Sequence, residues 1–426
     1  MSRTQGVRFA VFSCVLLACF ANAGLAQSND AKKIDAFIKP FADAHQFSGV
    51  VLASENGKVI YEKAFGLANA DYKIPNQLNT RIGIASITKY MTAVILWRLI
   101  EEKKIALSDK LTRYIPDFPN GDKITIEMLM RHRSGIPHRV MPPEMESVSY
   151  TSAEFVDKVK QAKLLFEPGT QNRYSSAGYS VLARALEIAS GKDYAQLLRE
   201  YVFAPAGMTD SLTFDGESVI ERRAQDYYLS PNGLVNVPLK NYSFLVGAGS
   251  VFGTARDTYR FAEAVLDGKY GADVKTYFQG DGPFNGSGTT NGHRSYYEIA
   301  RDKKYGFAIL SNSAGVFDLI QKGLTEILQG KPVTVKTFAI PTIIANPNKN
   351  LDEFLGHYTG ADGAAIDIVL KNGFLYSSDI KLYPTKPDCF FEYRFFGNAC
   401  FARDAADKIK EIHWKGIGFD FTWIKQ

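Results

Sequence analysis

The stretch Ile84-Ala85-Ser86-Ile87-Thr88-Lys89 leads into an apolar segment, residues 91–100, with the composition of a buried helix. In a helix, residues three positions apart share a face, so the amine of Lys89 can reach the hydroxyl of Ser86. A serine hydroxyl becomes a good nucleophile only when a nearby base takes its proton, and a lysine is that base only when its pKa is lowered. The stretch therefore predicts a catalytic serine with its base attached.

The spacing of serine and lysine is weak evidence when taken alone. Roughly one or two S-x-x-K matches are expected by chance in a chain of this length. A second match, at residues 378–381, lies among short alternating segments without a helix pattern, and we interpret it as a chance match. The alternative for Ser86 is a helix N-cap followed by a solvated lysine. Other parts of the chain have to decide between the two interpretations.

The composition is that of an ordinary globular protein with two or three domains. The chain has 426 residues, of which 46% are hydrophobic and 22% are charged. The formal net charge is +5, without a long run of Lys or Arg, so the sequence predicts no nucleic-acid partner. The six histidines have no zinc-ligand spacing, so neither a metal nor another cofactor is predicted.

The first 26 residues have the pattern of an export signal. Arg3 and Arg8 precede an apolar run at 9–20, and small residues suited to cleavage follow at 21–26. The run is short for a membrane span. We therefore predict a secreted or periplasmic protein. The alternative is membrane anchoring through this segment, since Leu16-Leu17-Ala18-Cys19 loosely resembles a lipoprotein cleavage box.

Two cysteines remain beyond the leader, Cys389 and Cys400. In an oxidising compartment two thiols so close in sequence can form a disulfide. The alternative is two free, buried thiols. The sequence leaves both open.

The periodicity of apolar residues predicts a sheet assembled from both ends of a long region. A helix is predicted at 34–45, and strands at 47–52 and 59–65 flank a turn at Asn56-Gly57. Further helices are predicted at 126–131, 153–162, 177–190, 194–202 and 254–266, the last with a capped start at Thr254 and Asp257. Strands return at 295–300 and 307–311. This order favours one sheet with a helical region beside it.

The C-terminal part of the chain has a different character. Residues 331–350 contain three prolines and three asparagines and are predicted to be a linker. Residues 351–426 consist of short alternating apolar stretches separated by turn signals. This pattern predicts a small all-β domain.

Tyr174 is the candidate partner of the serine and the lysine. It follows a turn at Phe166-Glu167-Pro168-Gly169 that can present its side chain from a loop. A phenol near an ammonium group can relay protons, so Tyr174 can act as a general base or acid beside Ser86 and Lys89. The alternative is a buried aromatic residue with a satisfied hydroxyl.

A series of ordered motifs resolves these alternatives. The motifs are 47–51 with 66–69, 84–89, 129–137, 166–174, 205–208, and 247–250 followed by 254–257. In this order they resemble the serine β-lactamase and penicillin-binding protein family, in particular its class C-like branch. The resemblance covers most of residues 35–330.

The resemblance implies a fold and a set of roles. The implied α+β fold is an antiparallel sheet flanked by helices, with a helical subdomain, over residues 30–330. Residues 351–426 resemble the small β-barrel-like (lipocalin-like) domain of some relatives, and we expect that domain to add stability rather than cover the active site. Ser86 would attack an acyl carbonyl, Lys89 would deprotonate it, and Tyr174 would activate the serine or water and protonate the leaving group. The family's third catalytic motif, after the serine–lysine motif and the tyrosine motif, is usually K-[TS]-G or H-x-G. The backbone N–H of Ser86 would be one oxyanion donor, and a strand after this third motif would supply the second.

The third motif departs from the family pattern. Its best counterpart is Gly286-Ser287-Gly288 followed by Thr289, and no K-T-G, K-S-G or H-x-G occurs in the chain. The cation that holds a substrate carboxylate is therefore missing from its usual place, and His293 or Arg294 is the expected replacement. In the tyrosine motif, Tyr174-Ser175-Ser176, Ser176 stands where the family typically has an asparagine. The residues predicted to bind substrate are Ser176, Gly286, Ser287, Gly288 and Thr289.

The sequence thus predicts an exported serine hydrolase that acts through an acyl-serine intermediate. Its substrates are small-molecule or peptide esters or amides, of the esterase or D-amino-acid peptidase type. The missing cation disfavours penicillin chemistry, because a penicillin presents a carboxylate that needs a partner. The alternatives are a non-catalytic, penicillin-binding-like ligand-binding protein, or a true β-lactamase or DD-carboxypeptidase. No oligomeric state is predicted.

Overall fold

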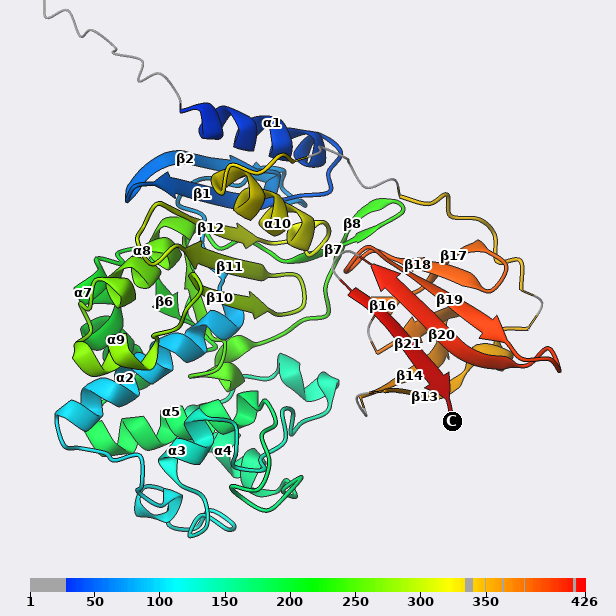
Figure 1. Cartoon of the computed structure of the whole chain (residues 1–426). Coiled ribbons are helices and arrows are strands. Elements are labelled where there is room, and N and C mark those ends of the chain that lie inside the picture. Colours follow the sequence, from blue (N-terminus) through cyan, green and yellow to red (C-terminus); the bar gives the residue numbers. More distant parts are fainter. Residues whose placement is uncertain (1–27, 334–339, 349, 362–363, 379, 417–418) are drawn as a thin grey trace, which may run out of the picture.

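The structure is a computed structural model that describes residues 28–333, 340–348, 350–361, 364–378, 380–416 and 419–426. Within these residues, the larger part is built on a five-stranded antiparallel sheet (Figure 1). In spatial order its strands are β10 (Phe284–Thr289), β11 (Arg294–Ile299), β12 (Tyr305–Ser311), β1 (Gly49–Glu55) and β2 (Lys58–Phe65). Strand β1 pairs with β12 from Gly49 opposite Ser311 to Glu55 opposite Tyr305. The sheet therefore joins the two ends of the region, which confirms the prediction.

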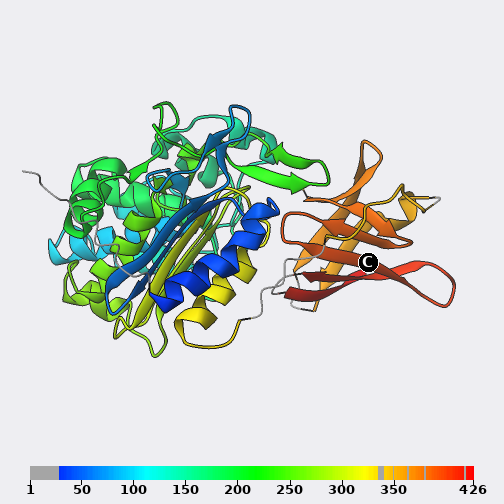
Figure 2. The ribbon, with the colours of Figure 1, turned by 90° about the horizontal axis from the view of Figure 1, so that it is seen from above.

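Both faces of this sheet are covered, which explains why β1 and β12 are almost entirely buried. Helices α1 (Asn29–Asp43) and α10 (Phe317–Leu328) lie side by side on one face (Figure 2). Successive side chains of a strand point to opposite faces. Val51 accordingly packs with these helices, whereas Val50 and Leu52 belong to the core on the other face.

The second face carries α8 (Ala255–Leu266) and, next to it, a helical region. The other helices of this part are α2 (Thr88–Glu101), α3 (Ile126–Met130), α4 (Ser152–Lys160), α5 (Ser176–Ser190), α6 (Tyr194–Leu198), α7 (Ala204–Ala206) and α9 (Ala272–Tyr277). Thr254 caps α8 by accepting a 3.1 Å hydrogen bond from the N–H of Asp257, as predicted. The helix predicted at 194–202 is regular only to Leu198 and continues as a π-helix, Arg199–Phe203.

Short strands connect the sheet to the helical region. They are β3 (Leu67–Asn69), β4 (Ile74–Pro75), β5 (Ile82–Gly83), β6 (Leu212–Thr213), β7 (Tyr227–Ser230), β8 (Gly233–Asn236) and β9 (Val251–Gly253). Strand β5 pairs with β9, and the N–H of Ile84 donates to the carbonyl of Val251 at 2.9 Å. This pairing fixes the chain immediately before Ser86.

The C-terminal part is an all-β, barrel-like domain, as predicted (Figure 1). Within the described residues its sheet runs β16-β15-β14-β13-β21-β20-β19-β18-β17. These strands are β13 (Gly356–Gly360), β14 (Ala365–Lys371), β15 (Phe374–Ser377), β16 (Ile380–Lys381), β17 (Tyr383–Lys386), β18 (Cys389–Glu392), β19 (Gly397–Arg403), β20 (Ile409–Gly416) and β21 (Phe419–Lys425). The domain has its own core, in which Phe354, Tyr358 and Ile412 are fully buried.

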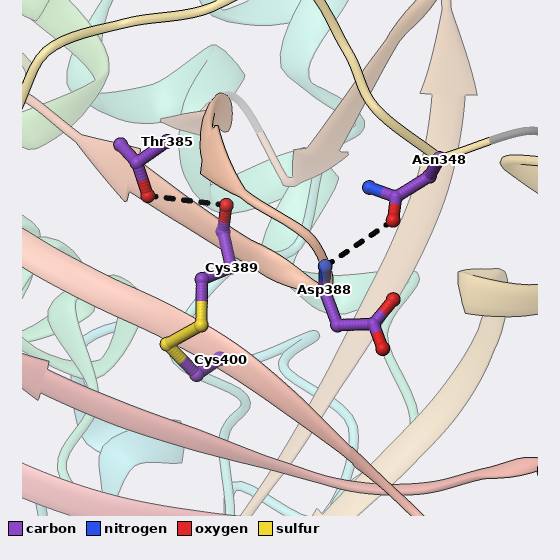
Figure 3. Close-up of a disulfide and its surroundings, with 5 residues drawn as sticks. All are labelled: Asn348, Thr385, Asp388, Cys389 and Cys400. Carbon is purple, nitrogen blue, oxygen red and sulfur yellow. Dashed lines mark hydrogen bonds between the residues drawn. A yellow bond between two sulfur atoms is a disulfide. The ribbon is translucent and has the colours of Figure 1, made fainter.

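Cys389 and Cys400 form a disulfide that joins β18 to β19 (Figure 3). The sequence left open whether they pair or remain free thiols, and the structure shows them bonded. Two hydrogen bonds hold the same strand: Thr385 donates to the carbonyl of Cys389, and the N–H of Asp388 donates to the side chain of Asn348.

Replacing both cysteines by serine is expected to lower the free energy of unfolding of the C-terminal domain by about 3 kcal/mol. A disulfide restricts the unfolded chain, and this one closes a loop with a sequence separation of 11. Urea unfolding of the oxidised wild type and the double variant measures the difference. Dithiothreitol should destabilise the wild type and leave the double variant unchanged. Equal unfolding of the oxidised and reduced wild type would contradict the expectation.

Two predictions fall wholly or partly outside the described residues. The export signal at 1–26 lies outside them, and so do residues 334–339 and 349 of the predicted linker. The described parts of 331–350 contain no helix or strand. Among the described helices, none combines the length and apolar character needed to cross a membrane.

Candidate active site

Ser86 lies in a single 3-10 turn, Ala85–Ile87, directly before α2. The preceding residue, Ala85, has a left-handed φ of 49°, which is unusual for a residue with a Cβ. Such strained positions gather at functional sites, where the surrounding structure holds them. Here the strained turn presents the half-buried Ser86 hydroxyl at the junction of the sheet and the helical region.

Lys89 is buried, with 5% of its surface exposed, and its amine donates to Ser86 Oγ at 3.2 Å. It also donates to the carbonyl of Ala248 at 2.8 Å and lies 4.8 Å from the centre of the Tyr174 ring. Within the described residues no carboxylate forms an ion pair with it. Burial therefore lowers the pKa of Lys89 to about 7. At this pKa a large share of the amine is neutral near pH 7 and can accept a proton.

Tyr174 precedes α5, and its hydroxyl donates to Ser86 Oγ at 2.9 Å. Burial raises the pKa of Tyr174, although side-chain hydrogen bonds to Ser86 and Ser176 oppose the shift. The phenol therefore carries its proton at neutral pH. The structure brings Ser86, Lys89 and Tyr174 together within one hydrogen-bonded group.

Two histidines that the sequence did not single out stack on Tyr174. The rings of His132 and His138 lie 4.6 and 5.4 Å from the Tyr174 ring. Their Nδ1 atoms accept from the backbone N–H groups of Ser175 and Ser176 at 3.2 and 3.1 Å. Burial, and then the charge of Lys89, lower both pKa values to about 4, so both rings are neutral at pH 7. The two histidines orient Tyr174 and its loop. The stretch 129–137, which resembles a motif of the family, is the part of the sequence that could have indicated His132.

Strand β10 passes beside the serine and is the edge of the sheet. A Cβ on Gly288 would lie 2.9 Å from the backbone nitrogen of Ser86, so only glycine allows this approach. The N–H of Thr290, directly after β10, points to the β11 side of the hairpin, where it donates to the carbonyl of His293 at 3.0 Å. Because successive N–H groups of a strand point to opposite sides, the N–H of Thr289 points to the open edge.

A cavity of about 950 Å³ surrounds the three residues. Of the predicted substrate-binding residues, those that line it are Ser176, Ser287, Gly288 and Thr289. Gly286 faces the other side of β10, where a Cβ would lie 2.7 Å from the Tyr297 ring. Gly286 is therefore a packing position, because strand side chains alternate and Ser287 takes the cavity side.

The expected replacements for the missing cation do not reach this cavity. His293 is fully buried between Tyr242 and Phe252, and burial lowers its pKa. Arg294 pairs with Asp318 and stacks on Phe317 at 4.8 Å. The prediction for both residues is wrong, because His293 is enclosed in the core and Arg294 is held by Asp318 and Phe317, outside the lining of the cavity.

The second serine–lysine match lies in the C-terminal domain. Its Lys381 is placed over the ring of Phe374, 3.3 Å from the ring centre. Neither Ser378 nor Lys381 is among the residues that line the cavity.

A five-stranded antiparallel sheet, a helical region and a Ser-Lys-Tyr group at their junction define a β-lactamase-like protein. The family model described as "Beta-lactamase" matches residues 34–277. The chain belongs to this family.

Individual relatives agree with this assignment. The chain is 30% identical over 238 residues to "Putative penicillin-binding protein PbpX" of Bacillus subtilis (strain 168), covering 56% of this chain and 59% of that protein. It is 27% identical over 226 residues to "Teichoic acid D-alanine hydrolase" of Staphylococcus aureus (strain MRSA252), covering 53% and 55%. The matches thus span little more than half the length of these relatives. The solved structure of "SurE" has a TM-score of 0.62 at 19% identity and covers 93% of this chain and 99% of that one, so both domains share its fold.

Proposed function

We propose that this protein is a serine hydrolase that cleaves ester or amide substrates through an acyl-serine intermediate. The observation that carries the proposal is the buried amine of Lys89, 3.2 Å from Ser86 Oγ with a pKa of about 7. A lowered lysine pKa next to an accessible hydroxyl is typical of a catalytic base and is not required of a lysine that only stabilises the fold. A neutral amine at this position is a base for the serine.

In the proposed reaction Ser86, Lys89 and Tyr174 act while the acyl-serine forms, and they act again while water hydrolyses it. Lys89 takes the hydroxyl proton of Ser86 as Oγ attacks the substrate carbonyl carbon. The N–H groups of Ser86 and Thr289 bind the oxygen that becomes negative. The proton then passes through Tyr174 to the leaving oxygen or nitrogen as its bond to the carbonyl carbon breaks. Water repeats these steps on the acyl-serine, which releases a carboxylic acid and returns the proton to Ser86 Oγ.

The substrate class follows from the departures in the motifs. β10 contributes no lysine beside the reacting centre, and Ser176 replaces an amide side chain with a smaller hydroxyl. A bicyclic lactam holds its carboxylate rigidly next to this strand, where it meets no cation from β10. Linear esters and amides do not depend on that contact. A relative named as a D-alanine hydrolase supports this preference.

A substrate panel tests the proposal. We expect kcat/KM for 4-nitrophenyl pentanoate to exceed that for the lactam nitrocefin by at least about tenfold, as expected when one charged contact is missing. D-Alanine 4-nitroanilide completes the panel as the amide. Hydrolysis rates are measured by absorbance, with Ser86→Ala as the background.

Two other outcomes would replace the proposal. Faster hydrolysis of nitrocefin than of the ester would make the protein a true β-lactamase. Binding of panel compounds, seen as a raised Tm, without any hydrolysis would make it a non-catalytic ligand-binding protein.

We also propose that the protein works outside the cytoplasm. Residues 1–26 have the pattern of an export signal, and the Cys389–Cys400 disulfide suits an oxidising compartment. Mass spectrometry of the N-terminus after cell fractionation tests this, and an uncleaved cytoplasmic chain would contradict it.

A further inference from the structure

One residue of the C-terminal domain lines the active-site cavity. Arg394 lies in the turn between β18 and β19, yet it shares the cavity with Ser86, Tyr174 and the third-motif residue Thr289. The sequence favoured a C-terminal domain that only adds stability. The structure instead places one of its cations in the wall of the site.

The turn that carries Arg394 is built around a buried carboxylate. Glu392 is fully buried and accepts hydrogen bonds from the N–H groups of Arg394, Phe395 and Gly397 at 2.8, 3.0 and 2.8 Å. A Cβ on Gly397 would lie 2.7 Å from a carboxylate oxygen of Glu392, so this approach requires glycine. The backbone of Arg394 is therefore fixed within its own domain.

The same turn is also fixed to the catalytic domain. Phe391, Tyr393 and Phe396 are at most 5% exposed and belong to the hydrophobic core that contains Val316 and Phe317. Side chains on both sides of Arg394 are thus anchored in the core between the five-stranded sheet and helices α1 and α10. Core packing therefore holds the backbone of Arg394 against the catalytic domain.

The guanidinium rests against aromatic rings. It lies 5.1 Å from the centre of the Tyr228 ring and 5.4 Å from that of Phe395. Tyr228 belongs to the β7–β8 hairpin, which ends near Pro238, the residue whose carbonyl accepts from Asn291. Arg394 therefore enters the cavity beside the segment that follows the third motif, where β10 supplies no cation.

The charge of the cavity favours an anionic ligand. Among the described residues, the cations that line it besides the catalytic Lys89 are Arg131, Arg139, Lys240 and Arg394, and Glu146 is the only carboxylate. Lys240 pairs with Glu146 at 2.7 Å, and Arg131 pairs with Glu127 at 2.9 Å. A guanidinium has five N–H donors in a planar fork that matches a carboxylate, so it can bind one while keeping other partners.

We propose that Arg394 binds a carboxylate carried by the substrate, so that the C-terminal domain completes the active site. This inference rests on the proposed function, because it assigns a substrate class to the same site. The acceptor is a carboxylate on a flexible chain rather than on a rigid lactam, because Arg394 comes from the C-terminal domain and not from β10, where the family places its cation. Glu392 is a positioning residue for this contact.

Matched esters test the inference. Mono-4-nitrophenyl glutarate carries its carboxylate on the acyl side and 3-acetoxybenzoate on the leaving group; 4-nitrophenyl pentanoate and phenyl acetate are the neutral counterparts. The readout is the ratio of kcat/KM for a charged ester to that for its neutral partner. In Arg394→Ala we expect the ratio for at least one pair to fall about tenfold to a hundredfold. The ratio for Arg394→Lys should lie between the ratios for the wild type and for Arg394→Ala, because lysine keeps the positive charge but lacks the planar guanidinium group.

The control is Lys410→Ala, which removes an exposed cation of the same domain outside the cavity. It should keep both ratios within about twofold of the wild type. Unchanged ratios in Arg394→Ala would overturn the inference, as would an equal loss for charged and neutral esters. If Arg394→Ala does not fold, Arg394→Gln, checked by circular dichroism, replaces it.

A binding measurement separates failure of this inference from failure of the proposed function. Calorimetry compares the binding of mono-4-nitrophenyl glutarate and of 3-acetoxybenzoate to Ser86→Ala and to Ser86→Ala/Arg394→Ala. We expect Kd for at least one of the two esters to rise about tenfold or more in the double variant, whether or not the wild type turns over esters. Equal Kd values for both esters would reject the role of Arg394 and leave hydrolysis by Ser86 untouched.

Discussion

Ser86→Ala is expected to abolish covalent labelling by a fluorophosphonate and to lower kcat for 4-nitrophenyl pentanoate by at least about 10⁴-fold. The serine oxygen forms the bond to the acyl carbon, and the remaining groups only bind and polarise the substrate. Its hydroxyl already interacts with Lys89 at 3.2 Å and with Tyr174 at 2.9 Å. Gel fluorescence of the labelled protein and initial rates measure the two effects.

Ser378→Ala is the matched control for this experiment. It removes the serine of the other S-x-x-K sequence, which lies in the C-terminal domain outside the cavity. This variant should be labelled like the wild type. Equal labelling of the wild type and Ser86→Ala would show that Ser86 is not the nucleophile, whereas loss of labelling in Ser378→Ala would transfer the role to the C-terminal domain.

Lys89→Met is expected to lower kcat/KM by about 10²- to 10⁴-fold and to change the pH profile. In the wild type, kcat/KM should rise with pH through about 7, because burial lowers the pKa of Lys89 to that value and only the neutral amine accepts a proton. The rise should disappear in Lys89→Met. Initial ester hydrolysis rates between pH 5 and 9, corrected for spontaneous hydrolysis, measure both effects.

The surroundings of Lys89 assign this titration to the lysine. The groups that face it are Ser86, Tyr174, Tyr179, the carbonyl of Ala248, and the histidines His132 and His138. The pKa values of both histidines are lowered to about 4, and those of both tyrosines are raised, so none of them titrates near pH 7. Lys269→Met, at an exposed position outside the cavity, should keep the wild-type profile. A rise through pH 7 that persists in Lys89→Met would contradict the assignment.

The two domains are joined more closely than the sequence predicted. Phe391, Tyr393 and Phe396 complete a core of the catalytic domain, and Arg394 between them lines the cavity. The alternating pattern of residues 351–426 predicts strands correctly, but it carries no information about which face packs on another domain. Only the assembled structure could therefore show that the C-terminal domain contributes Arg394 to the wall of the cavity.

The sequence by itself determined the features that depend on neighbouring residues. The turn at Asn56-Gly57, the cap at Thr254 and the separation of Ser86 from Lys89 by three positions are local, because backbone geometry alone relates residues a few positions apart. Ordered motifs extended these local features to the β-lactamase family, and the matching family model confirms it. The fold could be predicted for this reason.

Only the tertiary structure decided the chemistry. The pKa of Lys89 is lowered by burial, and the carbonyl that accepts from its amine belongs to Ala248, 159 positions further along the chain. The C-terminal domain contributes Arg394 to the cavity wall, whereas packing keeps His293 and Arg294 out of it. Electrostatic environments arise from groups distant in sequence and close in space, and no local pattern encodes that distance.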